Sequence, residues 1–432
     1  MMLRVVTQGA EAKAELGRIA QRLADTHVQA EQVREILAQV QQRGDQALVE
    51  YTRQFDHQEL TPADFLVSGS QLDAAYQQVS PELLAAIRLA HKRITEFHQQ
   101  RVPQTWVQFA PDGMVLGKRY TAVDSAGVYV PGGRAAYPST VLMNCIPAKV
   151  AGVQRVVVVT PPGGDGSVHP AVLVAAQECG VQEIYRIGGA QAIAALAFGT
   201  ETIPRVDVIT GPGNIYVTLA KKQVYGRVGI DGLAGPSEVV IIADATAKAS
   251  HVAADLLAQA EHDPLAAAIL LTPDSELAQA VVQAVAAQLE QHPRRLLTEK
   301  SLAHYGLVVV VESLTQAAEL ANEFAPEHLE LAVAEPWDLL PQIRHAGAIF
   351  LGHHTPEALG DYLAGPNHTL PTGGAARYSS GLSVETFLKA SNLVAASPAA
   401  LRELGAAVIR LAETEGLPSH AASVRLRLDA GC

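Results

Sequence analysis

Two polar residues near the end of a predicted helix could hold a divalent metal ion. Gln259 and His262 close the helical stretch VAADLLAQAEH, directly before Asp263-Pro264. Side chains at positions i and i+3 share one face of a helix, and an imidazole together with an amide oxygen can bind zinc. Taken alone, the pair is better explained as a solvent-facing helix end, with His262 near the negative end of the helix dipole.

A carboxylate and an imidazole stand side by side in a second segment, FAPEHLEL. Glu327 and His328 are adjacent residues on a predicted loop that leads into a strand. Such residues can point into one cleft, where they could act as an acid and a base. The alternative is a helix stop followed by an exposed polar pair, and this pair alone favours that alternative.

Two further segments combine turn residues with possible ligands. Asp361 and His368 lie in GDYLAGPNH, where glycines and a proline indicate a tightly shaped loop. A hard oxygen ligand and an imidazole there could bind a metal or a substrate, although an ordinary structural turn explains the segment equally well. Glu415 and His420 lie in ETEGLPSH near the C-terminus, where loose polar tails are common.

Signals for a bound cofactor are weak when each is taken alone. The chain has no well-placed GxGxxG followed by an acidic residue about 20 positions on, so the standard dinucleotide motif is absent. The segment Gly211-Pro212-Gly213-Asn214 follows a predicted strand and opens a predicted helix. Its backbone amides could receive a phosphate or an amide-bearing ring, but a plain strand-to-helix turn is the better explanation of this motif by itself.

The cysteines are interpreted as structural. Cys145, Cys179 and Cys432 form neither a CxxC pair nor a disulfide framework, which fits a reducing compartment. A nucleophilic Cys145 would indicate aldehyde oxidation through a thioester. The apolar neighbours of Cys145 in TVLMNCIPAK favour a buried structural residue instead.

The elements that must position these residues alternate between strands and helices. Residues 11–105 have the three- and four-residue apolar spacing of helices and no obvious chemistry. From about residue 120, β-branched runs alternate with Ala-rich helical stretches, and a second such series starts at residue 237. This order predicts parallel sheets with right-handed crossovers. The predicted strands are 125–130, 155–160, 183–188, 206–211, 237–244, 266–272, 307–311 and 347–352.

We therefore predict an α/β fold in which two related parallel-sheet domains are flanked by smaller helical units. The predicted boundaries are 1–110, 111–236, 237–382 and 383–432. Four strands of the first series end at VPGG, TPPGG, IGGAQ and TGPGN. Because the carboxyl ends of parallel strands form the ligand crevice of an open sheet, these tips are the expected binding edge.

Composition excludes several classes of protein. The 432 residues are 48% hydrophobic, which is enough to build a buried core and excludes a disordered chain. With 32 basic and 44 acidic residues the formal net charge is -12, so nucleic acid is an improbable partner. The apolar runs are too short to span a membrane, and the N-terminus has no long apolar core of a secretory signal. We expect a soluble cytoplasmic protein.

Eight segments, taken together and in order, resemble the L-histidinol dehydrogenase family. They span roughly residues 115–420, and such a linked set outweighs the separate alternatives given above. The resemblance implies two incomplete Rossmann-like domains of the aldehyde-dehydrogenase type. It also implies the oxidation of L-histidinol through L-histidinal to L-histidine, the last step of histidine biosynthesis. The segments are GVYVPGG, IGGAQAIAALAFGT, VDVITGPGN, VGIDGLAGPSE, LLAQAEHDP, FAPEHLEL, GDYLAGPNHTLPTGG and EGLPSH.

The resemblance implies a role for each candidate residue. The family is a zinc-dependent homodimer that uses two NAD molecules in sequence, with one zinc ion per subunit. Glu327 and His328 become the catalytic pair. The implied zinc ligands are Gln259, His262, Asp361 and His420. The implied substrate contacts are Ser237, His368 and Glu415 together with His328 and the four zinc ligands. The positions that match NAD contacts are Tyr129, Gln191 and Asn214.

The same resemblance implies a mechanism and an assembly. Zinc would anchor the substrate, His328 would take the hydroxyl proton, and Glu327 would activate water for the second oxidation. Residues 111–236 would bind NAD, residues 237–382 would carry the metal and the catalytic pair, and residues 383–432 would cross to the partner subunit. Glu415 and His420 would then complete the neighbouring site.

Three other readings remain open at this stage. One is a cysteine-dependent aldehyde dehydrogenase, and another is a related zinc-dependent amino-alcohol dehydrogenase. The third is a metal-binding protein without turnover. The sequence does not distinguish zinc from manganese.

Overall fold

The first predicted series of strands and helices forms a five-stranded parallel sheet. In this computed structural model, which describes residues 3–7, 9–22, 27–100, 102–132 and 136–429, its strand order is β6-β5-β4-β7-β8. The first strand of this sheet in the sequence, β4, lies in the centre, and later strands are added first on one side and then on the other. A topological switch point therefore lies between β4 and β7. The strands are β4 (Ser125–Tyr129), β5 (Arg155–Thr160), β6 (Glu183–Arg186), β7 (Val208–Thr210) and β8 (Gly229–Ile230).

Helices cover this sheet and are covered in turn by N-terminal helices. The connecting helices are α7 (Pro138–Ala151), α8 (Pro170–Glu178), α9 (Gly189–Phe198) and α10 (Ile215–Val224). The N-terminal helix α2 packs on α9 and α10, and α3 packs on α9. Helix α5 packs on α8, and α6 packs on α7 and α8. These N-terminal helices are α2 (His27–Arg43), α3 (Asp45–Asp56), α4 (Pro62–Phe65), α5 (Gly69–Ala75), the 3-10 turn η1 (Tyr76–Gln78) and α6 (Pro81–Gln99).

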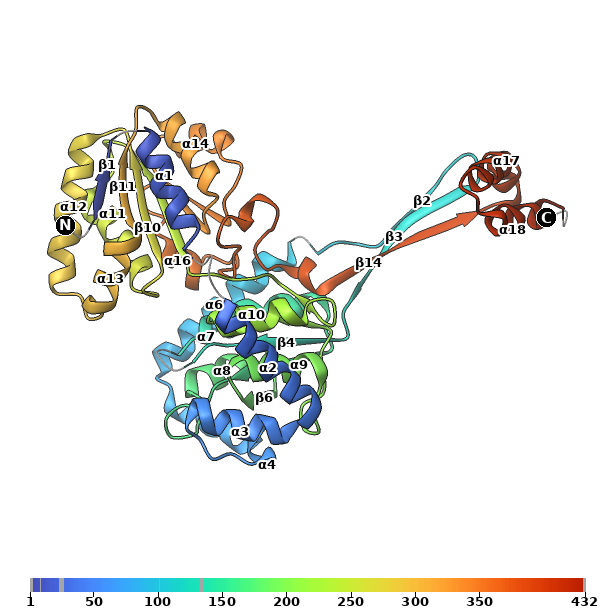
Figure 1. Cartoon of the computed structure of the whole chain (residues 1–432), viewed down its shortest axis with the longest axis horizontal. Coiled ribbons are helices and arrows are strands. Elements are labelled where there is room, and N and C mark those ends of the chain that lie inside the picture. Colours follow the sequence, from blue (N-terminus) through green and yellow to red (C-terminus); the bar gives the residue numbers. More distant parts are fainter. Residues whose placement is uncertain (1–2, 8, 23–26, 101, 133–135, 430–432) are drawn as a thin grey trace. The chain divides into compact units, whose positions relative to one another are not determined.

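The second series forms a six-stranded parallel sheet of the same winding, in the order β1-β11-β10-β9-β12-β13. Every residue of β9 and β10 is buried, as expected for strands covered on both faces. Its edge strand β1 and the following α1 come from the start of the chain and lie against this sheet (Figure 1). The strands are β1 (Arg4–Val6), β9 (Glu238–Ala243), β10 (Ala267–Thr272), β11 (Gly306–Val310), β12 (His328–Ala332) and β13 (Ala348–Leu351).

The helices of the second series complete this part of the fold, and the predicted α/β class with two parallel sheets is confirmed. For β12 we predicted only that a strand follows the loop of Glu327 and His328, without bounds, because the buried His328 and Glu330 break the apolar run that identifies a buried strand. His328 proves to be the first residue of that strand and not part of the loop. The helices are α1 (Gly9–Ala20), α11 (Ala249–Ala260), α12 (Ser275–Glu290), α13 (Arg295–Tyr305), α14 (Leu314–Phe324), α15 (Pro336–Leu339), α16 (Glu357–Tyr362) and the 3-10 turns η2 (Leu340–Gln342), η3 (Ala375–Arg377) and η4 (Val384–Phe387).

The chain divides into two compact units, and the second is a small antiparallel sheet with two helices. The first unit comprises residues 1–100 and 124–387, with both parallel sheets, and the second comprises 101–123 and 388–432. The second contains β2 (Trp106–Phe109), β3 (Met114–Ala122), β14 (Leu388–Ala396), α17 (Pro398–Thr414) and α18 (Pro418–Asp429), with strand order β14-β3-β2. The predicted helix after residue 383 is therefore wrong for β14, whose pairing partner β3 lies far away in the sequence.

Candidate active site

The predicted catalytic residues gather at the amino edge of the second sheet. Glu327 directly precedes β12, and His328 is the first residue of that strand. Ser237 directly precedes β9, which pairs with β12, so the three residues start from neighbouring strand ends. Helix α11 follows β9 and returns to the same edge, as a parallel crossover must. Its last turn carries Gln259, and His262 follows shortly after its end.

Helix α16 brings two carboxylates to this edge. Glu357 and Asp361 stand at positions i and i+4 and therefore share one face of the helix. One donor atom each from His328, Glu357 and Asp361 all lie within 4.8 Å of one another. The structure thus brings the predicted residues His328 and Asp361 together with Glu357, a carboxylate that the sequence analysis did not select.

The side-chain amide of Gln259 is oriented by its acceptors. Gln259 is fully buried. Its amide nitrogen is assigned toward the Glu357 carboxylate and the Glu238 carbonyl oxygen, each at 3.2 Å, because an oxygen placed there would face only acceptors. The amide oxygen then lies 3.3 Å from Nδ1 of His262, whose ring is accessible. Because an amide oxygen can only accept, Nδ1 of His262 donates to it. The second lone pair of that oxygen and the lone pair of His262 Nε2 then remain for a divalent ion.

His328 has one ring nitrogen that is free to accept a proton. Its side chain is buried, and Nδ1 lies 3.1 Å from the backbone carbonyl oxygen of Glu238. Because a carbonyl can only accept, Nδ1 carries the proton and Nε2 keeps its lone pair. Nε2 is buried and has no hydrogen-bond partner. Burial lowers the pKa of His328 to about 3, so the ring is neutral at physiological pH.

Glu327 is a carboxyl group whose surroundings make it a stronger base. Its Oε2 accepts a hydrogen bond from the backbone N–H of Glu238 at 3.0 Å. Burial, followed by repulsion from the Glu238 carboxylate, raises the pKa of Glu327 well above its ordinary value. A raised pKa brings a carboxylate closer to the range that suits general base catalysis near neutral pH. The side chain of Ser237 also hydrogen-bonds to Glu327, so this predicted residue lies in the same site.

The donor set and its charge fit a zinc ion. Burial raises the pKa of Glu357 well above its ordinary value, and repulsion from the Asp361 carboxylate adds to this effect. Burial also raises the pKa of Asp361 to about 6. A divalent cation would relieve this repulsion, and the amide oxygen of Gln259, an imidazole of His262 and a carboxylate of Asp361 are ligands that zinc accepts.

His368 connects this edge with the first sheet. Its Nδ1 lies 3.1 Å from the backbone oxygen of Asp361, and its Nε2 lies 3.5 Å from Oγ1 of Thr140 in the first turn of α7. Helix α7 follows β4, so its first turn marks the carboxyl edge of the first sheet. The amino edge of the second sheet and the carboxyl edge of the first are thereby in contact through His368, which lies between them.

The residues predicted to hold NAD lie at the carboxyl edge of the first sheet. Tyr129 ends β4, Gln191 lies in the first turn of α9, and Asn214 caps α10. Tyr129 and Asn214 flank the switch point between β4 and β7, where doubly wound sheets bind ligands. Gln191 is buried, and its Oε1 has no partner. The side-chain oxygen of Asn214 caps α10, accepting from Tyr216 and Val217, which leaves its amide nitrogen available.

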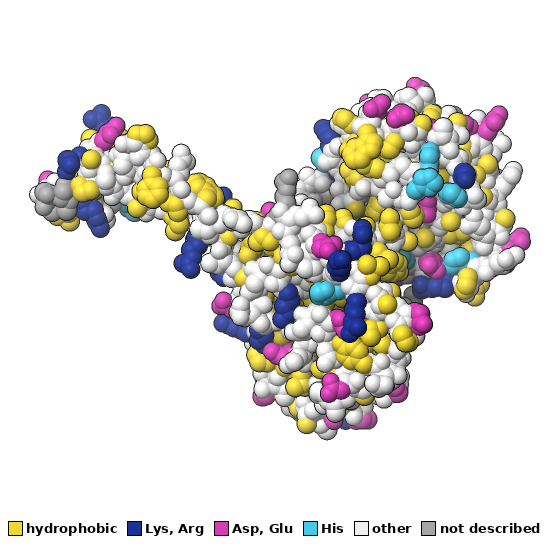
Figure 2. Space-filling model, turned by 180° about the vertical axis from the view of Figure 1, so that it is seen from behind, with side chains coloured by type: hydrophobic (Ala, Val, Ile, Leu, Met, Phe, Trp, Pro, Cys, Tyr) yellow, Lys and Arg dark blue, Asp and Glu magenta, His cyan; other side chains and the backbone are white. Residues whose placement is uncertain are grey.

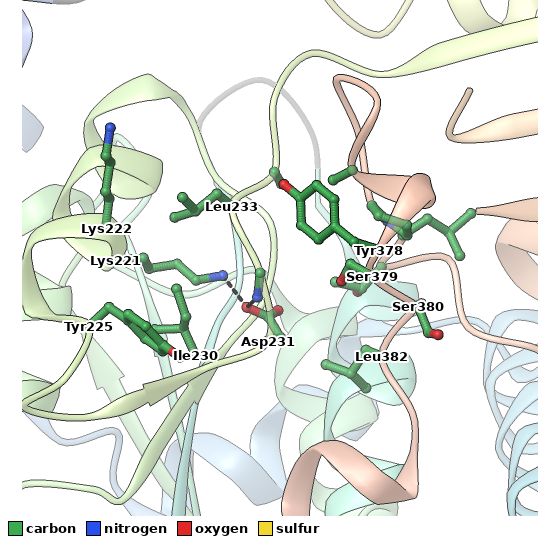
Figure 3. A pocket seen from close by; sticks show the side chains of 16 residues that line it. Lys221, Lys222, Tyr225, Ile230, Asp231, Leu233, Tyr378, Ser379, Ser380 and Leu382 are labelled. Carbon is green, nitrogen blue, oxygen red and sulfur yellow. Dashed lines mark hydrogen bonds and ion pairs between the residues drawn. The ribbon is translucent and has the colours of Figure 1, made fainter. Parts of the chain in front are cut away.

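A buried ion pair fixes the GPGN turn at this edge. Lys221 and Asp231 point toward each other in Figure 3 and form an ion pair. Lys221 donates to the Gly211 carbonyl oxygen at 3.0 Å, and Asp231 accepts from the Gly211 N–H at 2.8 Å. Gly211 has a φ of 110° and lies so close to the Tyr129 carbonyl that a Cβ would collide with it. A cavity of about 310 Å³ lies beside the pair, between α10 and the segment 369–382.

The two remaining predicted site residues belong to the second unit. Glu415 caps the C-terminal end of α17, and His420 lies in the first turn of α18. Both side chains are exposed within that unit. The predicted Gln259, His262 and Asp361 belong to the first unit.

The described cysteines do not provide a nucleophile. Cys145 and Cys179 are buried and free. Burial raises the pKa of Cys145 to about 12 and that of Cys179 well above its ordinary value, so neither is a thiolate near neutral pH. This argues against a thioester mechanism at Cys145. Cys432 lies outside the described residues.

Sequence reasoning missed two acidic residues of this site. Glu238 supplies a carbonyl to His328 and an N–H to Glu327, and these are backbone contacts that side-chain identity does not reveal. Glu357 does have a signal, because it precedes Asp361 by four residues on one helix face.

Among the described residues, no helix is both long and apolar enough to cross a membrane.

The chain is similar to known proteins along almost its entire length. The family model of histidinol dehydrogenase matches residues 20–428. The histidinol dehydrogenases of Thermosynechococcus vestitus and a Synechococcus strain are 70% and 68% identical, covering 99% of this chain and 100% and 99% of theirs. The crystal structure of histidinol dehydrogenase from Elizabethkingia anophelis has a TM-score of 0.93 and 37% identity, covering 99% of this chain and 98% of that one. This chain belongs to the histidinol dehydrogenase family.

Proposed function

We propose that this chain oxidises L-histidinol through L-histidinal to L-histidine in two NAD-dependent steps at a zinc site. The observation that carries the proposal is the unpartnered, buried Nε2 of His328, a ring whose Nδ1 lies 3.7 Å from Oε2 of Glu327, a carboxyl group with a raised pKa. These two groups supply a base for an alcohol and a base for water. They occur in a chain similar to histidinol dehydrogenases along almost its entire length.

Zinc would be held by Gln259, His262 and Asp361, together with the partner subunit's His420. When bound, zinc would anchor the imidazole and amine of the substrate and so hold its hydroxymethyl group in place. The contact between the Gln259 amide oxygen and the His262 ring and the mutual repulsion of the buried carboxylates support this assignment. Ser237, His368 and Glu415 are proposed as further substrate contacts.

His328 and Glu327 divide the proton transfers between them. Nε2 of His328 accepts the proton of the substrate hydroxyl, while the Glu238 carbonyl keeps Nδ1 protonated and the ring in place. The Glu327 carboxylate takes a proton from the water that attacks the aldehyde, while protonated His328 returns its proton to the aldehyde oxygen, so that the hydrate forms. Nε2 of His328 is then free to accept a hydroxyl proton again, this time from the hydrate. Because the described cysteines are buried thiols, no covalent thioester is required.

NAD would lie at the carboxyl edge of the first sheet, held by Tyr129, Gln191 and Asn214. When bound, NAD accepts the hydride in each of the two oxidations. The unpartnered Oε1 of Gln191 supports this placement, since a buried amide oxygen gains from a ligand that donates to it.

We also propose that the protein is a homodimer in which the second unit completes the site of the partner. The second unit exposes large apolar side chains, and Figure 2 shows hydrophobic side chains on its surface. Surface of this kind commonly marks a protein–protein interface. The most exposed of these residues are Phe109, Val394, Leu411 and Leu426.

The turnover stoichiometry tests the proposed function. With L-histidinol as substrate, we expect two NADH for each histidine formed, loss of turnover after chelation of zinc, and recovery when zinc is returned. Histidine measured by chromatography and NADH measured by absorbance give the ratio. The Cys145→Ala variant should turn over at a near-normal rate. One NADH per product, or an inactive Cys145→Ala enzyme that is correctly folded, would contradict the proposal.

Glu357 is expected to act as a positioning residue for the zinc site. In Glu357→Gln the side chain no longer offers two carboxylate acceptors to the amide of Gln259, which can then rotate its oxygen away from His262. Loss of such a supporting contact costs about 10- to 100-fold in metal affinity. Competition with a chromophoric chelator measures the affinity for zinc directly. The exposed Glu335 provides the control variant Glu335→Gln, and equal zinc affinities of the two variants would rule out this role.

A further inference from the structure

A buried carboxylate oxygen in the N-terminal helices has no partner. Asp56 is the last residue of α3, and its Oδ2 is buried without any hydrogen bond. Burying a carboxylate oxygen unpaired is costly, so such an atom in a folded protein calls for an explanation. Burial raises the pKa of Asp56 to about 6, so the group is largely ionised at neutral pH. None of the roles proposed above uses this residue.

The direction of α3 carries Asp56 to the carboxyl edge of the first sheet. At the start of α3, the Asp45 N–H donates to Glu201 at 2.8 Å and Thr202 donates to the Asp45 carboxylate at 2.9 Å. Glu201 and Thr202 follow the end of α9, on which α3 packs. The two helices therefore run antiparallel and have similar lengths, about 15 to 18 Å. The end of α3 must lie near the start of α9, which is the sheet edge that carries Gln191.

Contacts on the C-terminal side of Asp56 place it beside the tips of β5 and β6. His57 adopts a left-handed conformation with φ 55°, which ends α3. Gln58 then donates to the carbonyl oxygen of Gly164 at 3.0 Å, in the loop after β5. Arg186, the last residue of β6, donates to the backbone oxygen of Asp64. The segment that starts with Asp56 is thus tied to the ends of two strands.

The groups around Asp56 favour a ligand that donates hydrogen bonds. The negative charge of Asp56 contributes, after burial, to raising the pKa of Tyr129 to about 12. The Tyr129 hydroxyl accepts from the Gly189 N–H at 3.1 Å, and Gln191 Oε1 lies in the same helix turn without a partner. Two unpartnered acceptors at one edge suit a ligand with donors such as the hydroxyl groups of a sugar.

The position along the sheet identifies the half of the dinucleotide that lies here. Beyond the tips of β7 and β8, the chain runs directly to the catalytic residues. It passes Gly235, which donates to Thr372, and reaches the site residue Ser237 two positions later. The nicotinamide must lie on that side if hydride is to pass from the substrate. The β5 and β6 tips lie on the other side of β4, and the adenosine half of an extended dinucleotide would reach them.

Building on the proposed NAD-dependent function, we propose that Asp56 accepts hydrogen bonds from the hydroxyl groups of the adenosine ribose and so selects NAD over NADP. An acidic side chain that receives these hydroxyls is the usual means by which a dinucleotide fold distinguishes the two cofactors. In this chain the acid comes from a helix outside the sheet. The 2′-phosphate of NADP carries nearly two negative charges, which would lie against the negatively charged Asp56 carboxylate and be repelled by it. Arg186 is already engaged with backbone carbonyl oxygens of Asp64 and Gly166.

Binding of three nucleotides tests this proposal without turnover. Titration calorimetry with NAD, NADP and ADP-ribose compares the wild type with Asp56→Ala and Asp56→Asn. We expect Asp56→Ala to bind NAD and ADP-ribose about 10-fold more weakly or worse, by the same factor for both, because a hydrogen bond to a charged group is lost. Asp56→Asn should lose less affinity for NAD and should reduce the preference for NAD over NADP.

A neighbouring carboxylate provides the matched control. Glu59 lies three residues further on, is exposed, and pairs with Arg53, so Glu59→Gln should bind all three nucleotides as the wild type does. Circular dichroism establishes that each variant is folded. An unchanged ratio of NAD to NADP affinity in a folded Asp56→Asn protein would overturn the proposal, as would a loss for NAD without a loss for ADP-ribose. A wild type that binds neither dinucleotide would overturn the proposed function itself, a result distinct from the other two.

Discussion

In the Glu327→Gln variant, the oxidation of histidinal is expected to fall by about 100-fold or more, whereas histidinol is still converted to histidinal. Removing a general base costs about 10²- to 10⁴-fold in the step that uses it. Only the second step requires an activated water molecule. The amide is nearly isosteric and can still accept from the Glu238 N–H, which lies 3.0 Å from the native carboxylate, so the fold of the site is retained while the base is lost.

Two measurements separate the steps in this variant. Histidinal supplied directly reports the second oxidation, and trapping the aldehyde with an amine reagent during histidinol turnover reports the first. The ratio of NADH to substrate consumed should then fall from two toward one. The His328→Asn variant is the contrasting case, because Nε2 of His328 serves both steps and both rates should collapse together. Equal losses of the two oxidations in Glu327→Gln would remove the water-activating role from Glu327.

Much of the fold follows from local patterns in the sequence, and particular elements show why. The run RVVVVT at Arg155–Thr160 became β5 with the predicted bounds, because a strand buried on both faces has to be apolar throughout. The bounds of β12 could not be predicted, for the opposite reason. Its residues His328 and Glu330 are buried polar groups held by other elements: Nδ1 of His328 lies 3.1 Å from the Glu238 carbonyl oxygen, and the Glu357 N–H donates to Glu330 at 2.8 Å. Only the tertiary structure makes that strand possible.

The candidate site was harder to predict from residue patterns than the fold was. Gln259 and His262, or Glu327 and His328, are unremarkable as isolated pairs, and only the resemblance to a family linked them. Their convergence depends on β9 and β12 being neighbours in the sheet, and strand order is not visible in the local sequence. Asp56 shows the same limit, since the helical segment that carries it has no sequence signal for chemistry and acquires one only through its packing on α9.

Mixed dimers of two inactive variants should recover activity if the second unit completes the partner's site. We expect His262→Asn and His420→Asn to be inactive as separate homodimers, each having lost a proposed zinc ligand. In a mixed dimer with shared sites, one of the two sites carries both defects and the other carries neither, because a twofold dimer repeats the same contact twice. The recovered activity should therefore approach half of that of the wild type.

Differently tagged subunits allow the mixed dimer to be isolated by two successive affinity steps, and its zinc content should also rise to one ion per dimer. A second mixed dimer serves as the control for recovery caused merely by mixing subunits. It combines a His262→Asn subunit with a Gln259→Ala subunit. Both of these residues belong to the first unit, near each other in one chain, so each site of that mixed dimer lacks one ligand and activity should stay absent. If a verified dimer of His262→Asn and His420→Asn subunits were inactive and held no zinc, the proposed sites would not be shared, and His420 would have to act, if at all, within its own chain. Recovery confined to the pair that combines the two units would place His420 on one side of the subunit boundary and the other three proposed zinc ligands on the other side.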